Sequence, residues 1–557
     1  MRVVSFSATL VILLAGCGGS ATETFTVEPP IIETFSPDPS STQNPGLDNC
    51  VNDNAVQITG RVSYQTPTFS AVAGQGLNYN SIQTLSIRGA QIQALGTGDC
   101  VLSTSTVSST GSYSLGAPAN SNVKIRVNAR LINTAGATWD FEVRDNTNSE
   151  QLYALDGSFA SSGAANSIRN LTATTGWMGS GYSSTRSSAP FAILDTIYSA
   201  IQSVVAVDAG VNMPAADIFW SVNNNTADGE VSLGEIGGAF YSANAIYLLG
   251  TANSDTDEFD SHVVAHEWAH YLDDNLSRSD TIGGAHYTAD KLDMRVAASE
   301  GFATAFAALA LEDPVYRDSS GFQQGWDFSI NAETNASTDI GWFNEDSVLS
   351  ILYDIADSAG DSSDSVSLGF AALYEAMTST RYKEQASLVS VFSIIDAIKI
   401  NYPSQATNID TIVNAQSIST IVDAYGTNET NNGGDANNLP IYKALADDGV
   451  PVQVCSSNTL GEYNKLGVRQ FLRLSVSSSG RHTLLASHIS GDASADPDIN
   501  IYLNGVLVLS GDDSTSATES VTGSLSADEY IVEVFNYDII DNDQATGASA
   551  CFNVSVS

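Results

Sequence analysis

Two stretches of the chain, one near each end, alternate between apolar and polar residues with a period of two. The clearest alternating runs are 57–62, 90–94, 123–127, 471–476, 499–503 and 530–534. Such alternation places successive side chains on opposite faces of a strand, and short strands separated by turn residues are typical of β-sandwiches. We therefore expect a β-sandwich at each end of the chain.

Between these stretches, from Ala189 to about Ala446, apolar residues recur with helical spacing. The clearest helical runs are 191–198, 296–311, 348–356 and 388–400. Residues 132–185 instead hold short strand-like pieces rich in Gly and Ser. The pattern predicts a multi-domain chain: an N-terminal β-sandwich over residues 49–132, a central α+β, mainly helical domain over 133–449, and a C-terminal β-sandwich over 450–557.

The first 16 residues form a pattern of their own. Arg2 is followed by an apolar stretch that is too short to span a bilayer and ends in Leu14-Ala15-Gly16-Cys17. This ending resembles the lipobox of bacterial lipoproteins, which implies cleavage after Gly16 and a lipid on Cys17; a plain secretory signal is the alternative. Residues 17–48 are rich in Thr, Ser and Pro, as in an extended tether. We expect an exported, lipid-anchored protein at the outer membrane, cell surface or periplasm.

Composition narrows the set of partners. The 557 residues include 63 acidic and 21 basic ones, a formal net charge of −42. Nucleic acids and anionic membrane surfaces are bound by Lys and Arg patches, so neither is expected to be a main partner. Contact with a membrane is then expected only through the lipid on Cys17. The hydrophobic share of 43% is enough for ordinary packed cores.

Four cysteines remain once Cys17 is set aside: Cys50, Cys100, Cys455 and Cys551. In an exported chain they suggest two disulfides, with three possible connectivities. The cysteines fall in two pairs at opposite ends of the chain, so Cys50–Cys100 and Cys455–Cys551 are the natural choice. A four-cysteine zinc site is the alternative, which the absence of a C-x-x-C motif disfavours.

The residues with the clearest chemical meaning are His266-Glu267-Trp268-Ala269-His270. Residues four apart share one face of a helix, so both imidazoles can reach one tetrahedral metal ion. Glu267 then lies beside the ion without binding it, where it can take a proton from metal-bound water. The alternative is a solvated helix, but the strongly apolar flanks argue against it.

A third metal ligand has to come from elsewhere in the chain. A metzincin needs a histidine at position 276, which is Leu276 here. Glu300 is the better candidate, because it opens an apolar helix that could pack against the first one. Asp290, Asp293 and His286 are rivals by position. Glu300 could instead be an acid that interacts with the positive end of the helix dipole.

These motifs resemble the gluzincins, zinc peptidases whose third ligand is a downstream glutamate. Glu300-Gly301-Phe302 is similar to the Glu-Gly-Trp site of fungalysin-like peptidases, whereas Thr304 breaks the E-x-x-x-D of the thermolysin family. The resemblance implies one zinc ion held by His266, His270 and Glu300. The end domains resemble carboxypeptidase-regulatory-like and pre-peptidase C-terminal modules.

Weaker motifs suggest further roles. Asn244-Ala245 begins a run that resembles the substrate-pairing edge strand of gluzincins, although a core strand is as good an interpretation. Oxyanion stabilisation needs a donor besides the metal, for which Tyr287, His286 and Tyr353 are candidates. Calcium is possible at three acidic loops, although each is more readily read as a polar surface turn. These loops are 224–235, 496–498 and 511–513.

The leading hypothesis is a monomeric, zinc-dependent endopeptidase that hydrolyses peptide bonds of extracytoplasmic polypeptides with metal-activated water. His266, His270 and Glu300 would hold the zinc, and Glu267 would be the general base. The alternative is a catalytically silent cell-surface binding lipoprotein that retains a zincin fold. The presence of Glu267 argues against that alternative, because a purely structural zinc site has no use for a base.

Overall fold

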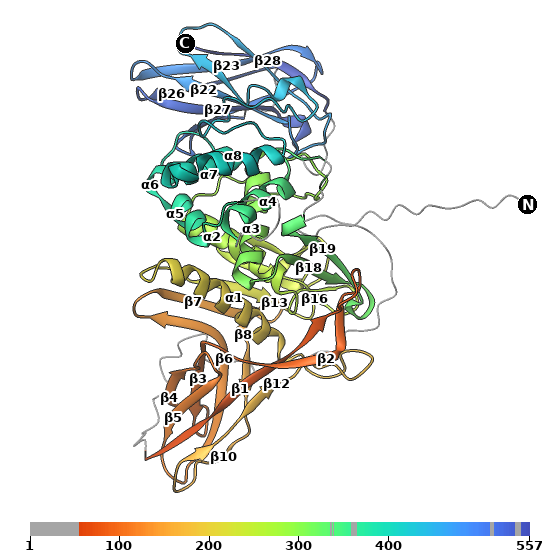
Figure 1. Ribbon diagram of the computed structural model, residues 1–557, viewed down its shortest axis with the longest axis vertical. Coiled ribbons are helices and arrows are strands. Elements are labelled where there is room, and N and C mark those ends of the chain that lie inside the picture. Colours follow the sequence, from red (N-terminus) through yellow and green to blue (C-terminus); the bar gives the residue numbers. More distant parts are fainter. Residues whose placement is uncertain (1–54, 335–336, 338, 358–364, 513–516, 541–546) are drawn as a thin grey trace, which may run out of the picture.

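The computed structural model describes residues 55–334, 337, 339–357, 365–512, 517–540 and 547–557. The expected signal segment, the tether, Cys17 and Cys50 lie outside these residues, and so does Asp513. Figure 1 shows three regions along the long axis: strands of the first half at one end, helices in the middle, and a second set of strands at the other end.

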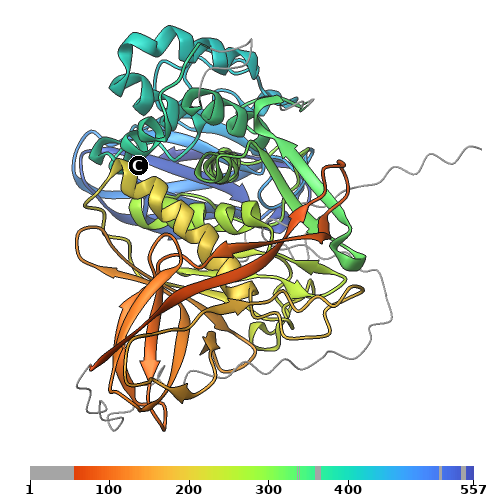
Figure 2. The same ribbon diagram turned by 60° about the horizontal axis from the view of Figure 1, so that its bottom comes forward.

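The first region is built from strands. They are β1 (Val56–Phe69), β2 (Leu77–Ser86), β3 (Ala90–Leu95), β4 (Val101–Thr106), β5 (Ser112–Ala117), β6 (Asn122–Thr134), β7 (Thr138–Asp145), β8 (Gln151–Leu152), β9 (Ala154–Asp156), β10 (Ala160–Ser161), β11 (Ser167–Ile168) and β12 (Leu171–Ala173). One five-stranded sheet is centred on β1, with β2, β5, β11 and β12 as its other strands. The long β1 crosses this part of the molecule diagonally (Figure 2).

The central region combines helices with short strands. Its helices are α1 (Ala189–Val207), α2 (Ser261–Leu276), α3 (Met294–Leu311), α4 (Glu345–Ala356), α5 (Phe370–Thr378), α6 (Thr380–Lys383), α7 (Val391–Asn401) and α8 (Ala406–Ala415). Its strands are β13 (Ala216–Trp220), β14 (Phe240–Ser242), β15 (Ala245–Leu248), β16 (Gly250–Thr251), β17 (Asp255–Thr256), β18 (Val315–Ser320) and β19 (Trp326–Asn331). The helices expected at 191–198, 296–311 and 348–356 are confirmed as α1, α3 and α4, whereas the last expected helix begins at Val391 rather than Leu388.

The boundary expected at residue 132 is wrong, because it falls inside β6. A ten-stranded sheet in the order β14-β15-β13-β7-β6-β3-β4, with β8, β9 and β10 attached, runs from the first region into the second. One hydrophobic core joins the two regions, from Val56 through the helices. The residues from Val123 to Ala129 on β6 are all buried, so this strand is an interior element and cannot close a separate domain.

The C-terminal β-sandwich is confirmed. Its strands are β20 (Tyr442–Ala446), β21 (Val452–Ser456), β22 (Arg469–Ser475), β23 (Gly480–Gly491), β24 (Pro497–Leu503), β25 (Val506–Gly511), β26 (Thr518–Leu525), β27 (Glu529–Asn536) and β28 (Ala550–Val556). They form a five-stranded sheet, β20-β22-β27-β24-β25, and a four-stranded sheet, β21-β28-β23-β26, around their own core. The expected start at Val450 is too late, because β20 already pairs with β22.

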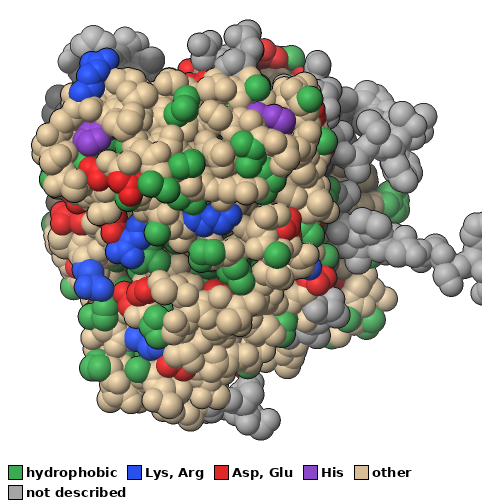
Figure 3. All heavy atoms as spheres, turned by 90° about the horizontal axis from the view of Figure 1, so that it is seen from above, with side chains coloured by type: hydrophobic (Ala, Val, Ile, Leu, Met, Phe, Trp, Pro, Cys, Tyr) green, Lys and Arg blue, Asp and Glu red, His purple; other side chains and the backbone are tan. Residues whose placement is uncertain are grey.

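The Cys455–Cys551 disulfide is present and links paired positions of β21 and β28. The other expected pair includes Cys50, which lies outside the described residues. Viewed over the C-terminal sandwich, hydrophobic and charged side chains are interspersed, without a large patch of one kind (Figure 3).

Two helices, α1 and α3, are long and apolar enough to cross a bilayer by length and composition alone. In the most apolar stretch of each helix, the greater part is buried inside the molecule, 56% for α1 and 78% for α3. The apolar side chains of both helices therefore pack in the protein core. The buried faces of α1 and α3 both pack near α2, which holds the candidate site in the middle of the molecule (Figure 1).

Candidate metal centre

Helix α2 is enclosed on all sides. Every residue from His262 to Asp273 is buried. On one side Trp268 stacks on Phe306 of α3, with ring centroids 5.5 Å apart, and on another Tyr271 meets Phe141 of the ten-stranded sheet edge-on at 5.2 Å. A helix that is covered all round holds its side chains in fixed positions, which a metal centre requires.

The structure brings His266, His270 and Glu300 together. The two histidine Nε2 atoms lie 3.1 Å apart, and Glu300 Oε2 lies 3.1 Å from Nε2 of His266 and 3.2 Å from Nε2 of His270. Ligands of one tetrahedral zinc ion are about 3.3 Å apart, because each Zn–N or Zn–O bond is about 2.0–2.1 Å long. The three donor atoms therefore fit a single zinc ion, with a fourth position left for water or substrate.

Both histidines are oriented from behind by hydroxyl groups of α3. His266 Nδ1 lies 3.1 Å from Thr304 Oγ1, and His270 Nδ1 lies 3.2 Å from Ser299 Oγ. When Nδ1 donates its proton to a hydroxyl oxygen, Nε2 keeps its lone pair for a metal ion. Thr304, which breaks the thermolysin-type motif in the sequence, thus contacts the first histidine. The Thr304 hydroxyl oxygen can accept the Nδ1 proton of His266, at the position where the thermolysin-type motif has an aspartate.

Glu267 lies next to the three donor atoms but is not part of their cluster. Its side chain is buried, and within the described residues its Oε2 has no hydrogen-bond partner. Burial raises the pKa of Glu267 to about 7, an effect that nearby His270 opposes and Glu300 reinforces. A carboxylate with a pKa near neutral can accept a proton and release it again, as a general base must.

Glu300 is held as a carboxylate despite its burial. Burial acts to raise its pKa, but His270 and His286 outweigh this effect and keep the pKa well below its usual range. Of its rivals for the third ligand, Asp293 caps α3 and pairs with Arg295, while Asp290 pairs with Lys465. Both aspartates are thus occupied elsewhere.

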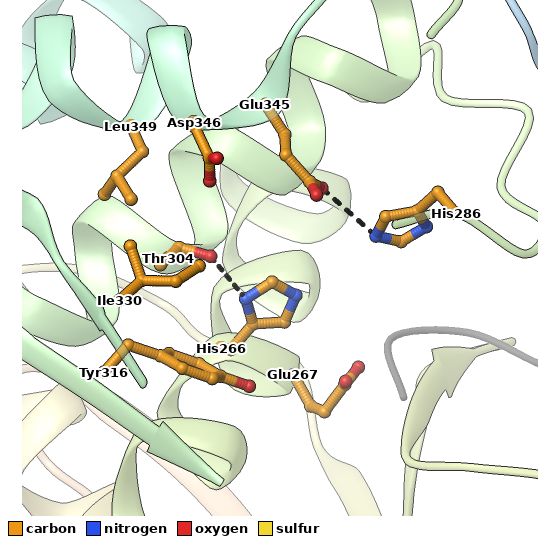
Figure 4. Close-up of a pocket in the computed structure, with 9 residues that line it drawn as sticks. All are labelled: His266, Glu267, His286, Thr304, Tyr316, Ile330, Glu345, Asp346 and Leu349. Atoms are coloured by element: carbon orange, nitrogen blue, oxygen red, sulfur yellow. Dashed lines mark hydrogen bonds and ion pairs between the residues drawn. The ribbon is translucent and has the colours of Figure 1, made fainter. Parts of the chain in front are cut away.

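His286 is the one oxyanion candidate that the structure brings to the site. Its Nε2 lies 3.3 Å from Glu345 and 3.6 Å from Glu300, and its Nδ1 lies 3.1 Å from the Gly284 carbonyl oxygen. Figure 4 shows His286 across from Glu267, with Glu345, the first residue of α4, pointing toward His286. Tyr287 and Tyr353, the other two candidates, are not among the residues that line the pocket beside the cluster.

That pocket extends from the cluster toward α4 and β19 (Figure 4). Its lining residues are His266, Glu267, His286, Thr304, Tyr316, Ile330, Glu345, Asp346 and Leu349. Tyr316, Glu345 and Asp346 were not expected from the sequence. In the sequence, Glu345 and Asp346 stand just before an apolar helical run, and acids in that position are equally explained by the start of a helix.

The expected substrate-pairing strand is wrong in one respect. Residues Ala245–Leu248 do form a strand, β15, but it lies between β13 and β14 and is not a sheet edge. The Asn244 side chain is also in use, since its Oδ1 accepts a hydrogen bond from Asn275 of α2. Asn244 thus ties the sheet to the metal-site helix. The edge position belongs to the short hairpin partner β14.

The acidic loop at Asn224–Glu235 is held together by hydrogen bonds. Asn224 bonds to Asn146 and to the Leu248 carbonyl oxygen, and Glu235 accepts from the Glu230 amide. Among the described residues, neither this loop nor Asp496 and Asp498 belongs to a group of His, Cys, Asp or Glu whose ligand atoms converge on one point. The convergent groups are instead His266–His270–Glu300 and Asp255–Asp257–Asp318.

Comparisons with known proteins support a peptidase at the level of enzyme class. Residues 223–393 match the family model of the mycolysin C-terminal domain, and this segment includes both α2 and α3. The mycolysin match implies a protease family. No curated protein matches the chain.

Two solved structures are similar to small parts of the chain. One is the pre-peptidase C-terminal domain of collagenase from Bacillus anthracis, with 12% identity, a TM-score of 0.15, and coverage of 21% of this chain and 96% of that one. The other is PliG of Aeromonas hydrophila, a periplasmic inhibitor of g-type lysozyme, with 12% identity, a TM-score of 0.14, and coverage of 21% and 97%. With TM-scores this low, neither structure bears on the function of this chain.

Proposed function

We propose that this protein is a zinc-dependent endopeptidase of gluzincin type that acts outside the cytoplasm. The observation that carries the proposal is the convergence of His266, His270 and Glu300 on one point, with Glu267 beside them. Two imidazoles and a carboxylate are a donor set for catalytic zinc, and the fit of their spacing to one ion supports this assignment. The mycolysin match covers the same two helices and supports a peptidase at the level of enzyme class.

When bound, zinc supplies Lewis-acid activation of a water molecule and of the peptide carbonyl. Glu267, which lies beside the three donor atoms, would take the proton from that water and later pass it to the leaving amine. His286 is positioned across the site, where its ring can donate a hydrogen bond to the carbonyl oxygen as negative charge develops. The Gly284 carbonyl oxygen orients His286 from behind through Nδ1, while Glu345 lies on the Nε2 side that faces the site.

A small pocket lies beside the site (Figure 4). Tyr316, Ile330 and Leu349 line one side of it, and Asp346 lies between Leu349 and Glu345. The burial of α2 keeps bulk water away from Glu267, which strengthens its electrostatic interactions. Attachment through a lipid on Cys17 would present this site to extracytoplasmic polypeptides, and the Cys455–Cys551 disulfide fits an oxidising compartment.

The substitution Glu267→Gln tests the proposal. It keeps the shape of the side chain but removes its basicity, so we expect hydrolysis of a denatured protein such as casein to fall by about 10²–10⁴-fold. Zinc content, measured by elemental analysis, should stay at one ion per chain. Unchanged hydrolysis would contradict a catalytic role for Glu267, and the absence of activity in zinc-loaded wild-type protein would favour a binding protein.

A further inference from the structure

A second group of buried acids lies where β17, β18 and the start of α2 meet. Carboxylate oxygens of Asp255, Asp257 and Asp318 all lie within 4.8 Å of one another, and we refer to these three residues as the acidic cluster. Asp257 is 2% exposed and Asp318 is 7% exposed. Asp260, the residue that precedes α2, is fully buried nearby. The acidic cluster is thus an internal feature of the fold.

Among the described residues, no Lys or Arg forms an ion pair with the acidic cluster or with Asp260. The negative charge of these carboxylates is therefore not balanced by a basic side chain of the described residues. Hydrogen bonds fix some of the carboxylates: Asp260 accepts from the amide and hydroxyl of Ser319, and Asp257 accepts from the Leu249 amide at 2.6 Å. These neutral donors orient the carboxylates but bring no positive charge.

Two oxygens of the acidic cluster are left over. Oδ1 of Asp318 and Oδ1 of Asp255 are both buried and, within the described part of the chain, have no hydrogen-bond partner. Asp318 follows Tyr316 by two residues on β18, so the two side chains share one face of the strand. That face is turned toward α2, since the Tyr316 ring lies 6.1 Å from the His266 ring. A carboxylate oxygen of Asp318 also lies within 4.8 Å of carboxylate oxygens of Asp255 and Asp257, so this buried side chain faces the other two acids.

Leaving such a group uncompensated is costly. Burial raises the pKa of Asp255 and of Asp257, and repulsion from Asp318 raises both further. Burial, with a contribution from Asp327, raises the pKa of Asp318 to about 7. Burying a carboxylate without a partner costs several kcal/mol, which a bound cation would offset.

We propose that the acidic cluster is a binding site for one calcium ion. Calcium takes oxygen ligands at about 2.3–2.6 Å, so oxygens on opposite sides of one ion lie about 5 Å apart. The carboxylate oxygens of the acidic cluster all lie within 4.8 Å of one another, so all three carboxylates can share one such ion. Zinc would find no nitrogen or sulfur ligand there. The site joins β17 and β18 to the loop that leads into α2, so the ion would fasten the start of the helix that carries His266.

This site was not expected from the sequence, where possible calcium ligands were sought in other loops. It is also independent of the proposed peptidase activity, because its ligands differ from those of the zinc centre. The test therefore measures binding and stability of the full-length, zinc-loaded chain after removal of other cations on a chelating resin. Calcium chloride alone is the titrant, with magnesium chloride as a second arm.

We expect isothermal titration calorimetry at pH 8 to detect one calcium ion per chain. The melting temperature should rise by about 5 °C between calcium-free buffer and 1 mM calcium, with a smaller rise in magnesium. Asp318→Asn should weaken calcium binding more than about tenfold and remove the rise. In calcium-free buffer the same variant should melt no lower than wild type, since it loses a buried repulsive charge.

Two control variants separate this site from general effects on folding. Asp280→Asn removes a buried carboxylate that Arg278 already balances at 2.8 Å, so its melting temperature should still rise with calcium. His270→Ala should lose zinc but keep the calcium response. A wild-type protein that neither binds calcium nor gains stability would overturn the proposal, as would an unchanged calcium response in Asp318→Asn or a larger rise in magnesium than in calcium.

Discussion

Buried carboxylates lie in two kinds of surroundings in this molecule. Where α3 meets the C-terminal sandwich, Glu533 of β27 contacts Arg295 at 2.7 Å and Arg469 at 3.7 Å, and all three side chains are buried. Around α2, by contrast, no Lys or Arg of the described residues forms an ion pair with Glu300 or with the acidic cluster. In a chain with 21 basic residues against 63 acidic ones, guanidinium groups balance the first kind. Metal ions are the natural balance for the second.

The two candidate metal centres also differ from each other. The one at His266, His270 and Glu300 mixes nitrogen and oxygen donors about 3 Å apart and has hydroxyl groups behind both histidines. The acidic cluster offers only oxygen donors. Donor type thus favours zinc at the first and calcium at the second. On these two proposals, α2 adjoins two ions with separate roles, catalysis and stability.

Glu533→Gln tests the centre that arginine balances and should have the largest effect on stability. The change leaves buried Arg469 without its carboxylate and Arg295 with Asp293 as its remaining partner, which costs about 3–5 kcal/mol in the free energy of unfolding. Chemical denaturation of wild type and variant measures this difference. Glu529→Gln, on the same strand, is the matched control, because its Arg473 partner is exposed and we expect a loss below about 1 kcal/mol. Equal losses in the two variants would show that burial of the Glu533 pair has no special weight.

The effect of Glu533→Gln should depend on pH. Burial acts to raise the pKa of Glu533, but Arg295 and Arg469 outweigh this and lower it from 4.5 to about 2. A lowered pKa in the folded state adds stability that is fully present above pH 4.5 and is lost as the pH falls through about 2. The stability gap between wild type and variant should shrink over that interval. A gap that stays constant down to pH 2 would argue against the ion pair.

Thr304→Val tests the zinc centre and should have a smaller effect. Valine keeps the volume of threonine but removes the oxygen that holds Nδ1 of His266, so zinc affinity should fall by about 10–100-fold. Competition with a chromophoric chelator measures it. Thr304→Ser restores the hydroxyl and should recover most of the affinity. Wild-type affinity in Thr304→Val would show that the hydroxyl does not orient the histidine.

The sequence was most informative where one helix carries the chemistry. His266, Glu267 and His270 could be identified because residues four apart lie on the same face of a helix, where both imidazoles can reach one metal ion. Glu300 could be proposed because it precedes an apolar run. It does not open the helix, since α3 begins at Met294, but its carboxylate lies within 3.2 Å of both histidines. Element types followed from periodicity, which reports burial of a face directly.

Features that depend on how distant segments meet could not be read in this way. β15 has the pattern of a strand wherever it lies, so nothing in Ala245–Leu248 showed that β14 covers its edge. The boundary at residue 132 failed because β6 lies inside a sheet that also includes β13, β14 and β15, which begin 80 residues or more further along. Asp255 and Asp318 are 63 positions apart in the sequence. Only the pairing of β17 with β18 brings them together.

X-ray absorption spectroscopy at the zinc edge tests the central claim most directly. The account predicts one zinc ion per chain in the wild-type protein, with a first shell of two imidazole nitrogens and carboxylate or water oxygens at about 2.0–2.1 Å. His270→Ala should lose most of its zinc, and the zinc that it retains under excess metal should show one imidazole nitrogen in place of two. A zinc shell without imidazole scattering, or one that His270→Ala leaves unchanged, would contradict a centre built from His266, His270 and Glu300.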